Sequence, residues 1–100
     1  MNLLSWNCRG GGNTRTVREI ATLCQSHSPN MVFLCETRQK ADKMRRIRRW
    51  IGLKGFTGVD SNGLSGGLAL CWHEAYEVEI LDKEERYIDA LVRVAEGATQ

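Results

Sequence analysis

Residues 3–13 read LLSWNCRGGGN: an apolar run of strand length ends at a polar Asn7 and three consecutive glycines follow. A short apolar run bounded by turn residues predicts a buried β-strand, over residues 2–7. Residues 13–27, NTRTVREIATLCQSH, then repeat apolar side chains at the period of a helix, and residues 31–36, MVFLCE, form a second apolar run. This order predicts two neighbouring strands joined by a crossover helix.

The helix over residues 13–27 has local signals for both of its ends. Thr16 and Glu19 have the spacing of a capping box, and Pro29 cannot continue the helix. Four apolar side chains share one face at the 3.6-residue period, namely Val17, Ile20, Leu23 and Cys24. We therefore expect this face to pack on the two strands.

The second half of the chain begins with a helix and continues with strands. A helix is expected from Ala41 to Trp50, followed by a C-cap at Gly52, with an apolar stripe of Ala41, Met44, Ile47 and Ile51. Strands are expected over residues 56–60, 67–72, 76–81 and 87–94, and a turn over 61–67. The predicted fold class is α/β (α+β), with the later strands antiparallel.

Length and composition are those of one small domain, residues 1–100. No apolar run approaches the ~18 residues that span a membrane, and no secretory signal begins the chain, so we expect an intracellular, non-secreted protein without a membrane partner. The compartment and the oligomeric state are not indicated.

The four cysteines match no zinc spacing and are expected to be small buried hydrophobes: Cys8, Cys24, Cys35 and Cys71.

Asn7 and Glu36 each follow an apolar strand run. If the two strands are adjacent and parallel, both residues lie at the carboxyl edge of the sheet, where open α/β sheets bind ligands. A carboxylate beside an amide oxygen is a donor set suited to Mg²⁺ or Mn²⁺. The alternative is that both residues are polar only because the chain leaves the core there.

Three blocks, LLSWNCRGGGN, VFLCETR and SGGLALCW, occur in this order at residues 3–13, 32–38 and 65–72. Together they resemble the N-terminal part of the endonuclease/exonuclease/phosphatase superfamily, and more closely the endonuclease domain of plant non-LTR (long interspersed element) retrotransposons. The resemblance implies a two-sheet, four-layer α/β sandwich, of which residues 1–100 are the N-terminal portion of an incomplete domain. It also implies hydrolysis of DNA phosphodiesters with Mg²⁺ (or Mn²⁺).

The resemblance assigns roles to three residues. Glu36 matches the metal ligand, and Asn7 matches the Asn that orders the metal site and hydrogen-bonds near the scissile phosphate. Arg38 stands where plant members often carry Lys and is a candidate nucleic-acid-binding residue; the alternative is that it is a solvated surface residue. The family completes its site with an Asp-x-Asn motif and a later Ser-Asp-His motif, and the chain is expected to lack both. His27 and His73 lie in other contexts. The implied phosphodiesterase is therefore not expected to be catalytically competent alone.

Charge favours a second interpretation. Between Arg38 and Lys54 there are eight Lys or Arg against Asp42 alone. A non-catalytic module could bind nucleic acid through the basic helix over residues 40–51, using Arg45, Arg46, Arg48 and Arg49 with Trp50 stacked on a base. The alternatives are that these arginines only solvate the outer face of an amphipathic helix, or that the chain is a functionless relic.

Overall fold

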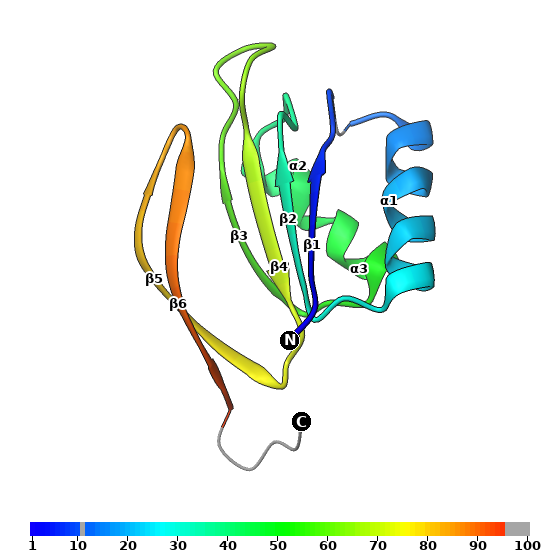
Figure 1. The fold of residues 1–100 in the computed structure, drawn as a ribbon. Helices are drawn as coiled ribbons and strands as arrows, with labels where there is room; N and C mark the ends of the chain where they lie inside the picture. Colours follow the sequence, from blue (N-terminus) through cyan, green and yellow to red (C-terminus); the bar gives the residue numbers. More distant parts are fainter. Residues whose placement is uncertain (11, 96–100) are drawn as a thin grey trace.

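The computed structural model describes residues 1–10 and 12–95. These residues form an α+β domain with two sheets (Figure 1). The elements in chain order are β1 (Leu3–Asn7), α1 (Thr14–His27), β2 (Met31–Cys35), α2 (Ala41–Arg45), α3 (Ile47–Ile51), β3 (Gly55–Val59), β4 (Leu68–Trp72), β5 (Tyr76–Glu84) and β6 (Tyr87–Val94).

The larger sheet has the strand order β1-β2-β4-β3. The pairing of β1 with β2 is parallel, with Asn7 opposite Cys35, which confirms the predicted crossover. Because β4 is antiparallel to both β2 and β3, strand β3 runs in the same direction as β1 and β2. The carboxyl ends of β1, β2 and β3 therefore meet at one edge, which we call the carboxyl edge: Asn7, Cys35 and Val59 with the residues that follow them.

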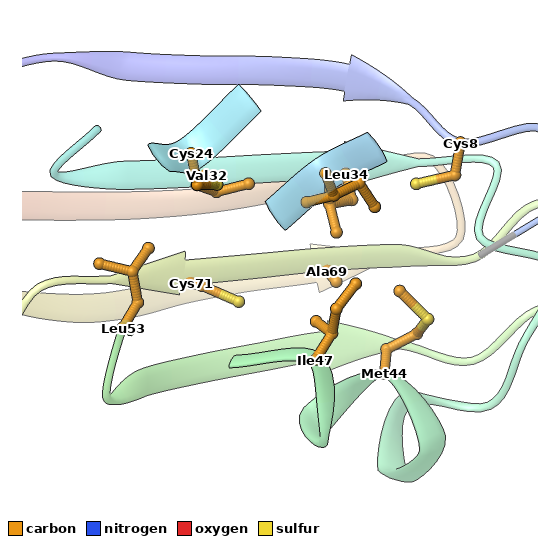
Figure 2. Packing of buried hydrophobic residues seen from close by; sticks show 10 residues of the cluster. Cys8, Cys24, Val32, Leu34, Met44, Ile47, Leu53, Ala69 and Cys71 are labelled. Carbon is orange, nitrogen blue, oxygen red and sulfur yellow. The ribbon is translucent and has the colours of Figure 1, made fainter. Parts of the chain in front are cut away.

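The core lies between one face of this sheet and the three helices. Alternate strand residues point toward the helices, and their side chains interdigitate with those of the helices (Figure 2). The β5–β6 hairpin lies on the side away from α1 (Figure 1). Buried members of the core cluster include Ile20, Cys24, Val32, Leu34, Met44, Ile47, Ala69 and Cys71.

The predicted helix from Ala41 to Trp50 is wrong as a single element, because it is divided at Arg46 into α2 and α3. The backbone switches there to tighter pairing: the N–H of Arg46 donates to the carbonyl of Lys43, and that of Arg49 to the carbonyl of Arg46. The tighter turn brings Met44 and Ile47, three residues apart, to the same part of the core. The expected C-cap is confirmed, since Gly52 has a φ of 75°.

The predicted capping box is also wrong. Asn13 is the N-cap of α1, and its side-chain oxygen accepts the N–H of Thr16 at 2.8 Å. Thr16 lies inside the helix and is buried, while Glu19 pairs with Arg15 at 3.4 Å. An Asn directly before the helix satisfies the free N–H groups of the first turn, so no capping box at Thr16 is formed.

Three further predictions concern the cysteines, the length of β5 and membrane-spanning segments. All four cysteines are free, and three of them are buried while Cys35 is half-buried. Strand β5 continues to Glu84, beyond the predicted end at residue 81, with a register irregularity between Ile80 and Asp82. Among the described residues, no helix combines the length and the apolar character needed to cross a bilayer.

Candidate functional site

The carboxyl edge brings Asn7 and Glu36 to neighbouring strand ends. Asn7 is the last residue of β1 and is level with Cys35, and Glu36 follows Cys35 directly. The side-chain oxygen of Asn7 accepts the N–H of Arg9 at 3.1 Å, which holds the amide at the turn that leaves the sheet. The two candidate metal donors thus lie at the carboxyl ends of adjacent parallel strands, as the sequence predicts.

Glu36 and Arg38 have an unusual backbone conformation. Their φ angles are 52° and 55°, in the left-handed region that residues with a side chain rarely adopt. Hydrogen bonds hold the segment from two sides: the N–H of Gly10 donates to the carbonyl of Glu36, and the N–H of Arg38 donates to the carbonyl of Gly66, both at 2.8 Å. Strained conformations of this kind cluster at functional sites.

The carboxylate of Glu36 faces one cation of this chain. Its Oε2 lies 3.9 Å from Nε of Arg38, and the two side chains are 43% and 44% exposed, respectively. A pair this long and this exposed contributes little to stability, so Arg38 can turn toward another anion at small cost. The carboxylate is then free to bind a cation, and the guanidinium is free to bind a phosphate.

The S-G-G block supports this edge from the side of β4. The N–H of Thr37 donates to the carbonyl of Gly67 at 3.2 Å. Gly67 has a φ of 94°, and a Cβ added there would collide with the hydroxyl of Thr37, which is fully buried. Glycine at this position therefore lets the β4 loop approach the segment that carries Glu36 and Arg38, in agreement with the turn predicted over residues 61–67.

The expectation that the chain lacks an Asp-x-Asn motif is wrong, because Asp60, Ser61 and Asn62 have this spacing, ahead of the third block rather than after it. Asp60 follows β3 at the carboxyl edge, but β4 lies between β3 and β2, so two strand spacings, roughly 10 Å, separate it from the end of β2. Its Oδ1 accepts the N–H of Ala41 at 2.7 Å, at the start of α2. Asp60 thus makes a structural hydrogen bond at the start of α2. The sequence could not indicate this bond, because Ala41 and Asp60 are 19 residues apart.

The donor set at the carboxyl edge is small. Within residues 1–10 and 12–95, no group of three or more His, Cys, Asp or Glu side chains is placed to hold a metal ion. A carboxylate and an amide oxygen fit Mg²⁺, which keeps several waters and often takes one or two carboxylates with substrate phosphates. Glu36 and Asn7 are the residues that could hold it.

Neither histidine lies at this edge. His73 follows β4, and its Nδ1 accepts the N–H of Ala75 at 2.9 Å. Its backbone N–H donates to the carbonyl of Asn30, just before β2 begins. His27 ends α1, and its carbonyl accepts the side-chain amide of Asn2 at 2.8 Å. Both histidines therefore lie at the amino ends of β1 and β2, opposite Asn7 and Glu36.

The four arginines of the predicted basic helix do not form one surface. The guanidinium of Arg45 lies over the ring of Phe56, 5.1 Å from its centroid. Arg48 donates through Nη1 to the carbonyl of Lys54 at 2.9 Å, beside Arg49. Arg46 lines a different hollow, together with Trp50. The arginines of the set therefore have different neighbours.

No protein-family description matches the chain, and no curated protein matches its sequence.

Proposed function

We propose that this chain carries the first half of the metal and phosphate site of a Mg²⁺-dependent DNA phosphodiesterase. The type is that of the endonuclease/exonuclease/phosphatase sandwich, and the origin is the endonuclease of a plant non-LTR retrotransposon. The observation that carries the proposal is the convergence of Asn7 and Glu36 at the ends of adjacent parallel strands. The strained, doubly anchored backbone at Glu36 supports it.

Each residue at the edge has a distinct task. Glu36 and Asn7 would hold the ion, and Mg²⁺ bound there supplies Lewis-acid stabilisation of charge on the phosphate. Arg38 leaves Glu36 and orients the phosphodiester through its planar guanidinium. Both histidines are at the opposite edge, so no imidazole of this chain is positioned to activate water. We propose that the chain binds metal and phosphate but does not cleave DNA by itself.

Metal binding is tested by paramagnetic broadening. Mn²⁺ added to the ¹⁵N-labelled chain is expected to broaden the amide signals of residues 7–10 and 36–38 first. Glu36→Gln removes a charged ligand and should abolish this localised broadening. Glu77→Gln, which changes an exposed carboxylate on β5, should leave it intact. Broadening that persists in Glu36→Gln, or that centres on β5, would contradict the proposed site.

Catalytic competence is tested with supercoiled plasmid. Incubation with the chain and Mg²⁺ is expected to give no nicked circles above the level without protein. Robust nicking that requires Mg²⁺ and disappears in Glu36→Gln would keep the metal site but overturn the claim that the chain is inactive alone.

A further inference from the structure

A groove runs between α1 and the α2–α3 pair. It consists of two hollows of about 140 and 300 Å³, and Gly12, Val17 and Trp50 line both of them. The indole of Trp50 is 72% exposed although α3 packs against α1. We call this feature the Trp50 groove. Its larger hollow is at the lower end of the size range of small-ligand sites.

Three cations line the Trp50 groove. Arg18 comes from α1, Lys43 from α2, and Arg46 from the junction between α2 and α3. No carboxylate lines either hollow, and none of the three cations is in an ion pair within the part of the chain that the structure describes. An exposed aromatic face beside three uncompensated positive charges is complementary to an anionic ligand that carries aromatic rings.

We propose that the Trp50 groove binds single-stranded nucleic acid, with a base stacked on Trp50 and backbone phosphates on Arg18, Lys43 and Arg46. Every base has a π-face, so stacking needs no particular sequence, and the cations follow the backbone. A duplex keeps its bases stacked inside and offers phosphates alone, so it gains nothing from the indole. This binding does not depend on the metal site proposed above.

Two arginines of the basic segment are excluded from this site by their contacts. Arg45 covers Phe56, and Arg48 is bonded to the carbonyl of Lys54, just before β3 begins. Gly55 pairs with Trp72, and Trp72 with Met31, so Lys54 lies toward the amino ends of β1 and β2. The amino end of β1 is roughly 13 Å from its carboxyl end at Asn7, which is the rise of a five-residue strand.

The role of Trp50 is tested by fluorescence anisotropy of a labelled dT10 strand in EDTA, which removes any contribution of divalent metal. Trp50→Ala should weaken binding about tenfold or more, the loss typical of one stacked base. Trp50→Phe, which keeps an aromatic ring, should recover most of the affinity. The exposed position allows both variants to fold, and far-UV circular dichroism checks this. Unchanged affinity in a folded Trp50→Ala would overturn the proposal.

The role of the cations is tested by neutralisation. Arg46→Gln should lower the affinity for dT10 several-fold and reduce the slope of log K against log salt by about 0.7, the change for one lost phosphate contact on a single strand. Arg49→Gln is the matched control, because Arg49 lies on α3 but lines a different hollow, with Arg48 and Lys54. Equal effects of the two variants would overturn the assignment to the groove.

Two competitors separate stacking from charge attraction. Unlabelled dT10 should displace the probe at concentrations near its own Kd, whereas inorganic polyphosphate of similar charge and a ten-base-pair duplex should compete at least tenfold less well. Equal competition by polyphosphate or by the duplex would show attraction by charge alone and would overturn the proposal. Because metal is absent throughout, failure here leaves the Mn²⁺ result at Glu36 unaffected, and the converse also holds.

Discussion

The backbone at Glu36 has a left-handed conformation, which favours Gly or Asn over Glu. A residue with a side chain costs about 1–2 kcal/mol in the left-handed conformation, whereas Asn and Gly adopt it more readily. The hydrogen bonds from Gly10 and to Gly66 hold Glu36 and Arg38 in this conformation. The Glu36–Arg38 pair adds little because it is long and half-exposed. The conformation of Glu36 therefore opposes stability at this position, which agrees with the metal-binding role proposed above.

The stability of a variant at this residue follows from the same conformation. Glu36→Asn should raise the free energy of unfolding by about 0.5–1 kcal/mol, because Asn tolerates a positive φ. Urea denaturation followed by circular dichroism measures the change. Glu77→Asn is the control, because Glu77 is an exposed residue within strand β5, where Asn is disfavoured. A loss of stability in Glu36→Asn as large as in Glu77→Asn would contradict this explanation.

Among the elements, α2 depends on a distant side chain for its start. Its N-cap residue, Lys40, makes no side-chain cap hydrogen bond, and the carboxylate of Asp60 accepts the N–H of Ala41 instead. This bond connects the end of β3 to the start of α2. Because α2 has only five residues, the hydrogen bond to one free N–H at its N-terminus is a large share of the interactions that stabilise it.

Removal of this contact should be measurable. Asp60→Ala is expected to lower the free energy of unfolding by about 1 kcal/mol, the typical value for a lost cap. Asp60→Asn keeps an acceptor oxygen and should lose less. Asp42→Ala, which removes an exposed carboxylate in the first turn of α2, is a control for the loss of negative charge. An equal loss in Asp42→Ala, measured by urea denaturation, would assign the effect to charge and not to the bond.

The elements also show which parts of the structure were predictable. The apolar periods of residues 2–7, 13–27 and 31–36 predicted a strand, a helix and a strand because those signals are local, and the parallel pairing placed Asn7 and Glu36 as expected. The capping by Asp60, the loop contacts of Gly66 and Gly67 and the break at Arg46 depend on residues distant in sequence or on core packing. No local pattern encodes them.

In the whole molecule, the hairpin is attached to the larger sheet by a few specific contacts. Lys83 donates through Nζ to the hydroxyl of Thr57 at 3.1 Å and to the carbonyl of Gly58 at 3.0 Å. The sequence predicted strands over residues 76–81 and 87–94 but could not indicate that β5 and β6 form a separate sheet. Leu81 and Leu91 of the hairpin remain exposed.

Buried thiols in the core between the larger sheet and the helices link the stability of the whole domain to pH. Burial raises the pKa of Cys8 and of Cys71 to about 12, and it also raises the pKa of Cys24. The hydrogen bond to Asp82 likewise raises the pKa of Tyr87 to about 12. In the unfolded chain a thiol ionises near its ordinary value of 9.0. Between pH 9 and 12 the unfolded state therefore releases protons that the folded state retains.

The stabilising effect of these groups is complete below about pH 9 and is lost as the pH rises toward 12. Each such thiol steepens the loss by up to about 1.4 kcal/mol per pH unit. Thermal unfolding at pH 8, 9.5 and 11 should give a falling Tm. Cys71→Ala should start from a lower Tm, because it leaves a small cavity, but should lose less between pH 8 and 11. Equal losses in the two proteins would show that the buried thiol does not titrate on unfolding.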